Sequence, residues 1–89
     1  MSYSIEYTSR AIKELKKLDK YTKLMIKSWI DKNLVNCVDP RLHGKALTGN
    51  QKGHWRYRIG DYRLISVIDD QKLIIIALNI GHRKNVYDV

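Results

Sequence analysis

The sequence predicts an α+β domain in which a helical hairpin packs on one face of a largely antiparallel sheet. A short alternating stretch is followed by two stretches with apolar residues at helical spacing, and then by three runs typical of strands. An order of one strand, two helices and a three-stranded antiparallel meander is typical of this fold class. With 89 residues the chain can bury one core, so we expect a single domain over residues 1–89.

The N-terminal half predicts a strand and two helices. Residues 3–7 alternate apolar and polar types, as in a short strand. Thr8 or Ser9 can cap the first helix and Asp19 the second, since these side chains accept hydrogen bonds from the first helical turn. Asp39-Pro40 then ends the second helix. The apolar stripes that predict burial are Ala11, Ile12, Leu15 and Leu18 in the first helix, and Met25, Ile26, Trp29, Ile30 and Leu34 in the second.

Two further segments complete the predicted fold. Residues 36–53 predict an irregular loop, because Gly44, Gly49 and Gly53 punctuate it. Residues 73–80, LIIIALNI, are almost continuously apolar, which is typical of a strand buried on both faces in the middle of a sheet. A turn over residues 69–72 separates this strand from the one before it.

Residues 54–67, HWRYRIGDYRLISV, predict a β-hairpin. A Gly60-Asp61 pair between two alternating runs is a two-residue hairpin signal. If Ile59 and Tyr62 flank the turn as partners, Arg58 faces Arg63 across the strands. Side chains alternate along a strand, so two faces follow. One carries Arg56, Arg58 and Arg63, and the other carries Trp55, Tyr57, Ile59, Tyr62 and Leu64.

The arginine-bearing face opposes folding unless an anion meets it. Like charges directly opposite each other in a sheet destabilise it by roughly 0.2–1 kcal/mol per pair. A phosphate-rich ligand would relieve this repulsion. Carboxylates of the chain itself, such as Asp61 or Glu14, would also relieve it on a solvated face, and the local pattern leaves both interpretations open.

Composition narrows the partners and the compartment. The formal net charge of +8 and the pI near 9.8 favour nucleic acid, an anionic membrane surface or an acidic protein as partner. The single cysteine, Cys37, excludes an intramolecular disulfide framework. No apolar run approaches the ~20 residues of a membrane span, and the polar N-terminus does not resemble a signal peptide. We therefore expect a cytoplasmic protein that is not inserted in a membrane.

Two motifs resemble the RelE/ParE superfamily of type II toxin–antitoxin toxins. The stretch LTGNQKGHWRYRIGDYRLISVIDD, followed by IIIALNIGHRKNVYDV, resembles the C-terminal half of the family. There, a loop of leucine, a polar residue and glycine precedes WRxRIGDYRL, and the chain closes on GHRxxVY. The length and the N-terminal helical hairpin also fit, so the resemblance covers the whole chain.

The resemblance implies a toxin that is neutralised by a small, acidic antitoxin. We expect the toxin alone to be a monomer and to form a hetero-oligomer with the antitoxin. Toxins of the RelE branch enter the ribosomal A site and cut the mRNA there without a metal or other cofactor. The RNA 2′-hydroxyl attacks the adjacent phosphate. The protein therefore has to orient the nucleotide, stabilise the growing negative charge and assist two proton transfers.

The resemblance assigns catalytic roles to side chains of the hairpin and the C-terminal tail. Arg63 matches the arginine of the family's "YR" position and resembles a bidentate clamp on the transition-state phosphate. Arg56 and Arg58 match two basic strand positions that are lysines in the best-known RelE toxins. Arg83 matches the arginine of the C-terminal motif, and Tyr87 a tyrosine expected to stack on or position the substrate.

The chain departs from the family where protons would be transferred. Arginine stays protonated, so the two strand arginines are poor general bases, and Lys45-Ala46-Leu47 replaces the loop glutamate of YoeB-like relatives. We predict that His82, with His54 second, transfers protons, or that charge stabilisation acts without a dedicated base. His43, in the irregular loop, is interpreted as structural. The side chains expected to bind RNA are Lys45, Lys52, His54 and Lys84.

Two other functions stay open at this point. ParE-like members of the superfamily bind DNA gyrase and block it, and a non-catalytic module would bind RNA through its basic face without cutting it. The gyrase-binding members generally lack a concentrated basic and aromatic site. The four arginines and Tyr87 therefore favour the mRNA endonuclease.

Overall fold

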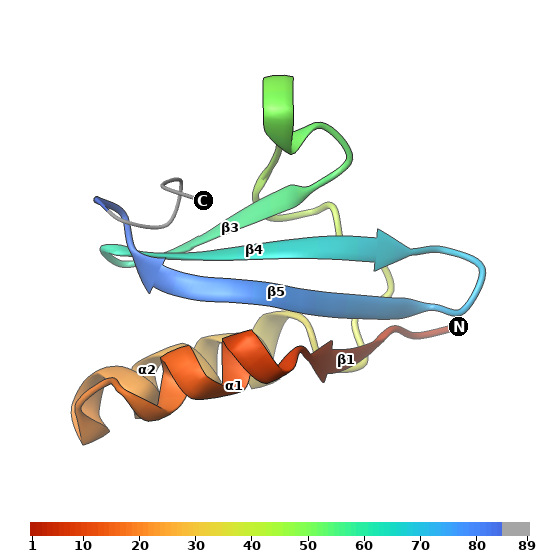
Figure 1. Ribbon diagram of the computed structural model, residues 1–89. Coiled ribbons are helices and arrows are strands. Elements are labelled where there is room, and N and C mark those ends of the chain that lie inside the picture. Colours follow the sequence, from red (N-terminus) through yellow and green to blue (C-terminus); the bar gives the residue numbers. More distant parts are fainter. Residues whose placement is uncertain (85–89) are drawn as a thin grey trace.

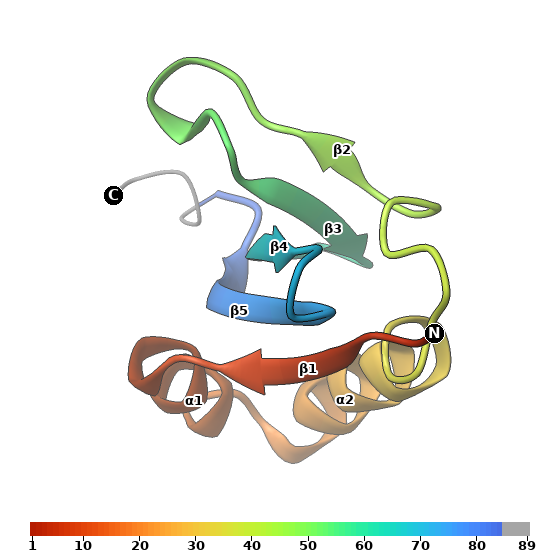
Figure 2. The same ribbon diagram turned by 90° about the vertical axis from the view of Figure 1, so that its right-hand side faces the viewer.

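The computed structural model describes residues 1–84 and confirms the α+β fold class. Five strands form one sheet with the order β1-β5-β4-β3-β2, in which β1 runs parallel to β5 and the other neighbours are antiparallel (Figure 1; β2 is labelled in Figure 2). Both helices lie on the same side of the sheet (Figure 2). In chain order, the elements are β1 (Ser4–Tyr7), α1 (Ser9–Lys16), α2 (Lys20–Asn33), β2 (Lys45–Ala46), the 3-10 helix η1 (Gly49–Gln51), β3 (Trp55–Ile59), β4 (Tyr62–Asp69) and β5 (Ile74–His82).

Both helices begin at the predicted caps. The Thr8 side chain accepts a hydrogen bond from the backbone N–H of Ala11 (3.1 Å), and the Asp19 carboxylate accepts one from Thr22 (3.1 Å). These bonds satisfy backbone donors that have no partner within the helix. They also hold the pKa of Asp19 below its usual range, because the side-chain hydroxyl and backbone N–H of Thr22 both favour the carboxylate.

The sequence prediction was wrong about the end of the second helix and about the loop that follows it. The second helix ends at Asn33, well before Asp39-Pro40, and the chain turns at Asn36, which has a left-handed backbone (φ 61°) that asparagine tolerates better than most residues. The predicted irregular loop also contains a strand, since Lys45–Ala46 pairs with β3. A two-residue strand is too short to show an alternating pattern, so the sequence could not reveal it.

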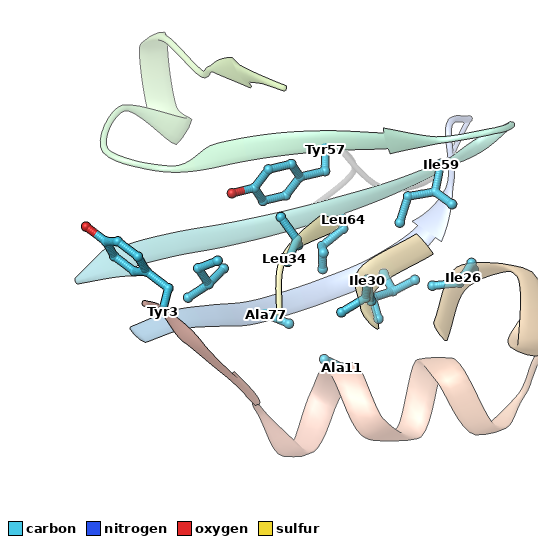
Figure 3. Packing of buried hydrophobic residues seen from close by; sticks show 11 residues of the cluster. Tyr3, Ala11, Ile26, Ile30, Leu34, Tyr57, Ile59, Leu64 and Ala77 are labelled. Atoms are coloured by element: carbon cyan, nitrogen blue, oxygen red, sulfur yellow. The ribbon is translucent and has the colours of Figure 1, made fainter. Parts of the chain in front are cut away.

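The core fills the space between the helices and one face of the sheet (Figure 3). Apolar side chains of α2 meet those of the β3–β4 hairpin there, and α1 contributes Ala11 beside β5. Fully burying one of the leucine or isoleucine side chains of this core contributes about 1.5–3 kcal/mol to folding. The buried members are Tyr3, Ala11, Ile26, Ile30, Leu34, Tyr57, Ile59, Leu64, Ile75, Ala77 and Ile80.

A β-bulge in β5 decides which of its side chains face the helices. Ile65 pairs with Asn79 and Ser66 pairs with Ala77, so Leu78 is an extra residue in β5. The alternation shifts by one residue there. Ile75 before the bulge and Ile80 after it therefore both reach the core. As predicted, β5 lies inside the sheet, between β1 and β4.

Within residues 1–84, neither helix combines the length and apolar character needed to cross a bilayer.

Candidate nucleic-acid interface

Basic side chains from three adjacent strands lie on the sheet face opposite the helices. The hairpin has the predicted register, with Arg58 opposite Arg63 and Arg56 opposite Ile65. The short strand β2 adds Lys45 opposite Arg56. Residues paired directly across strands point to the same face. Lys45, Arg56, Arg58 and Arg63 therefore form one surface, which we call the arginine face.

Arg63 is held in place by the turn of its own hairpin. Only 9% of this residue is exposed, and its Nη1 donates to the backbone carbonyls of Gly60 (3.2 Å) and Tyr62 (3.1 Å). Gly60 supplies the left-handed backbone (φ 60°) of that turn. A guanidinium fixed in this way can stabilise charge on a phosphate without first reorganising. Arg58, across the ladder, is exposed.

The end of β5 brings Arg83 to the same turn. Its backbone N–H donates to the carbonyl of Asp61 (2.9 Å), which continues the ladder beyond the pairing of Tyr62 with His82. Arg83 follows Gly81 by two positions, and Gly81 pairs with Arg63. Arg83 therefore lies next to the hairpin turn that carries Arg63, and it is exposed. The predicted stacking residue, Tyr87, lies outside the described residues.

One of the two carboxylates considered as partners for the arginines is engaged on the helix side. Glu14 of α1 accepts hydrogen bonds from the backbone N–H of Ile80 (2.8 Å) and from Nε of Arg10 (3.4 Å). The other, Asp61, is exposed at the hairpin turn. Glu14 thus fastens α1 to β5 from the face opposite the arginines.

The structure does not bring His82 onto the arginine face. His82 pairs with Tyr62, and their rings meet edge to face with centroids 5.6 Å apart. Tyr62 packs against the core, so both rings lie on the helix side. The bulge at Leu78 causes this, because it shifts the alternation of β5 by one residue before His82.

The other predicted RNA-binding residues are spread around the arginine face. His54 precedes β3, where its Nδ1 lies 3.0 Å from Oε1 of Gln51, and it lines a pocket of about 230 Å³ with Trp55 and Ile68 of the helix side. Lys52 is exposed at the end of η1. Lys84 is exposed just past β5, and its backbone N–H donates to Nδ1 of His82 (3.3 Å). None of these three residues is paired across the ladder with an arginine of the face.

The histidine that does adjoin the arginine face is His43, for which the sequence predicted a structural role. A pocket of about 320 Å³ opens beside β3. His43 forms its wall together with the ring of Trp29, whose centroid lies 5.6 Å from that of the imidazole. The residues lining the pocket are Trp29, His43, Gly44, Lys45, Arg56 and Arg58.

Three side-chain interactions hold the loop that carries His43. The carbonyl of His43 accepts a hydrogen bond from Nε1 of Trp55 (2.7 Å). The hydroxyl of Tyr57 donates to the carbonyl of Pro40, and burial raises the pKa of that hydroxyl well above its usual range. Arg41 forms a bidentate pair with Asp70 (2.9 and 3.0 Å), which lowers the pKa of the Asp70 carboxyl. The loop is therefore fastened to β3 and to the β4–β5 turn.

Comparison with known proteins identifies the family to which this chain belongs. Residues 5–87 match the family described as ParE toxin of type II toxin–antitoxin system, parDE. Toxin RelG of Mycobacterium tuberculosis is 29% identical over 87 residues, which cover 98% of either chain. The mRNA interferase toxin RelE of Escherichia coli is 28% identical over 86 residues, which cover 94% of this chain and 86% of RelE.

Solved structures agree with the sequence matches. The RelBE2 toxin–antitoxin complex from Mycobacterium tuberculosis contains a chain that superposes with a TM-score of 0.84 at 27% identity, covering 96% of this chain and 95% of the other. The archaeal RelE–RelB complex from Pyrococcus horikoshii shares the fold, with a TM-score of 0.69 at 24% identity over 97% of this chain and all of the other. The chain belongs to the ParE toxin family of type II toxin–antitoxin systems, within the RelE/ParE superfamily.

Proposed function

We propose that this toxin is a ribosome-dependent mRNA endonuclease that cleaves in the A site by attack of the RNA 2′-hydroxyl on the adjacent phosphate. The observation that carries the proposal is the convergence of Lys45, Arg56, Arg58 and Arg63 on one face of the sheet. Such a face suits the phosphate backbone of RNA, since cationic side chains supply most of the affinity for nucleic acid. The relative RelE, at 28% identity, supports the same class of activity through its name, mRNA interferase toxin.

The arginines supply charge stabilisation in this mechanism. Arg63, fixed by the turn carbonyls, binds the phosphate whose negative charge grows as the 2′-oxygen attacks. Arg58 lies across from it, and Arg83 reaches the same turn from β5. Arg56 extends the positive surface toward β2, and Tyr87 is proposed to stack on the substrate.

The positions of His82 and His54, which the sequence predicts to transfer protons, make this role less favourable. His82 packs edge to face on Tyr62 at the helix side, and His54 is engaged with Gln51. Their placement favours the second of the two predicted mechanisms, in which charge stabilisation acts without His82 or His54 as a dedicated base.

A small acidic antitoxin is the proposed partner that neutralises the toxin. The net charge of +8 gives an acidic protein a complementary surface. One similar solved structure, RelBE2 from Mycobacterium tuberculosis, is a toxin–antitoxin complex, and RelE from Pyrococcus horikoshii was also solved as a complex with RelB. Binding over the arginine face would block RNA, which gives neutralisation a direct physical cause.

Mapping mRNA ends after incubation with programmed ribosomes tests the proposed function. We expect cuts within the A-site codon that disappear in the Arg58→Ala variant. Arg58 is the preferred position because its side chain is exposed, whereas Arg63 also holds turn carbonyls. Intact mRNA together with inhibited gyrase supercoiling would replace the proposal with the gyrase-blocking function. Ribosome binding without cuts would replace it with non-catalytic RNA binding.

A further inference from the structure

The pocket beside β3 combines aromatic rings with the positive charge of the arginine face. The rings of Trp29 and His43, both half-buried, form an aromatic wall. Lys45, Arg56 and Arg58 bring positive charge to the same pocket, and two of these side chains are exposed. Aromatic rings beside cations are the combination with which proteins hold single-stranded RNA, since bases stack on the rings and phosphates pair with the cations.

The short strand β2 explains why a pocket forms at this place. Lys45 and Ala46 pair with only the first two residues of β3, Arg56 and Trp55. Gly44 then turns the chain away with a left-handed backbone (φ 88°), and a Cβ at this position would collide with the carbonyl oxygen of Arg56. Within the described part of the chain, no strand pairs with the remaining β3 residues on this side.

The loop that closes the pocket is held independently of the His43 ring. The carbonyl of His43, and not its imidazole, accepts the hydrogen bond from Trp55 (2.7 Å). The imidazole instead meets the ring of Trp29, which in turn lies against Tyr57 with centroids 5.8 Å apart. The wall is therefore preorganised, and the side chain of His43 can be exchanged without removing the backbone contact.

We propose that this pocket binds one nucleotide of the RNA, with its base against His43 and Trp29 and its phosphate at Lys45 and Arg58. The volume of about 320 Å³ lies at the small end of the range for ligand pockets, so it suits a single nucleotide. The inference rests on the proposed function in one respect. It places this nucleotide next to the phosphate that is attacked during cleavage, which Arg58 and Arg63 are proposed to hold. His43 becomes a positioning residue for the substrate.

Direct binding of mononucleotides tests the pocket without the ribosome. The folded chain is titrated with each of the four nucleoside 5′-monophosphates, and with ribose 5-phosphate, while the indole N–H signals of Trp29 and Trp55 are followed by NMR. We expect at least one nucleotide to shift the Trp29 signal. Ribose 5-phosphate should bind about tenfold more weakly, because a stacked base contributes a factor of this order.

Matched variants locate the binding. Arg58→Ala should weaken nucleotide binding about tenfold, since a charged hydrogen bond is lost. His43→Ala should weaken it by a factor of about 5–10, whereas His43→Phe keeps a ring and retains most of the affinity. Lys72→Ala, an exposed lysine in the β4–β5 turn, is the control for loss of one positive charge and should leave binding unchanged. A cooperative unfolding transition and a circular dichroism spectrum like that of the parent chain show that the fold of each variant is intact.

Several outcomes would contradict the proposal that this pocket binds a nucleotide. Equal affinity for nucleotides and for ribose 5-phosphate would reduce it to a phosphate site. Affinity unaffected by His43→Ala and Arg58→Ala would place nucleotide binding elsewhere, and tighter binding of a tetraglutamate peptide than of any nucleotide would assign the pocket to an acidic protein. Nucleotide binding by a chain that cuts no mRNA would instead leave the pocket standing and remove the proposed function.

Discussion

The two faces of the β3–β4 hairpin are built from the same consecutive residues, 55–69, yet one contributes to folding and the other works against it. On the helix side, Tyr57, Ile59 and Leu64 are buried against α2. On the other side, Arg58 and Arg63 stand directly opposite each other, which costs stability in a free sheet. One face therefore stabilises the fold, and the other keeps positive charge together for an anionic ligand. The difference teaches that repulsion retained within a well-packed hairpin is a signal of function.

The largest effect on the stability of the fold is expected from residues on the helix side of the hairpin. Leu64→Ala removes a fully buried side chain between the hairpin and the helices, so the free energy of unfolding should fall by about 2–5 kcal/mol. Urea unfolding followed by circular dichroism measures it. A loss below about 1 kcal/mol would mean that the core near Leu64 rearranges to fill the cavity, which would break the contrast between the faces.

The largest effect on activity is expected from the arginine face. Arg58→Ala should lower the rate of mRNA cleavage on programmed ribosomes by about 10²- to 10³-fold, the range seen when one preorganised donor to a transition-state anion is removed. Lys72→Ala is the matched control, because it removes an exposed cation from the opposite end of the sheet. Equal losses in the two variants would show that net charge, and not the arginine face, determines cleavage.

The histidines sharpen the comparison, since His43 lines the pocket beside the arginine face and His82 does not. His82→Ala should leave both the rate and the pH profile of cleavage unchanged, because its ring packs on Tyr62 at the helix side. His43→Ala should slow cleavage about tenfold if the nucleotide pocket positions the substrate. The two variants are compared at several pH values in one cleavage assay. A slower rate only in the His82 variant would restore that residue to the mechanism.

These two histidines show where sequence reasoning succeeded and where it ended. The register of the hairpin was predictable, since Gly60-Asp61 and the alternation around it are local signals. The bulge at Leu78 was not, because residues 73–78 are all apolar and hide a shift in alternation. The position of His43 in the pocket was not predictable either. It depends on a contact with Trp29 of α2, and the spacing of residues along the chain does not encode that contact.

The stability of the loop that carries His43 should depend on pH in the acid range. Hydrogen bonds from Arg41 and Tyr3 lower the pKa of the Asp70 carboxyl. Because the folded pKa is depressed, the stabilising contribution is present above the ordinary carboxyl range, near about pH 4, and is lost as the pH falls through the folded pKa. The urea midpoints of Asp70→Asn and the parent chain should therefore differ at pH 7 and converge toward pH 2.

A variant that removes only one of the two donors tests the cause of that pH dependence. Tyr3→Phe keeps the Arg41–Asp70 pair but removes the hydroxyl donor (2.7 Å), so its urea midpoint at neutral pH should lie between those of the parent and Asp70→Asn. A constant difference between Asp70→Asn and the parent at all pH values would mean that the carboxylate charge is irrelevant to the loop.

The smallest expected effect is the most direct test of the contrast between the faces. Replacing Arg58 by alanine removes one of two like charges paired across the strands, so the chain should become more stable by roughly 0.2–1 kcal/mol while it loses activity. The gain should shrink as salt is raised, because an exposed guanidinium is screened within a Debye length of about 10 Å at 0.1 M. Urea unfolding at low and high salt measures both quantities. A loss of stability at every salt concentration would show that Arg58 contributes to the fold, and the arginine face would then no longer differ from the helix face in kind.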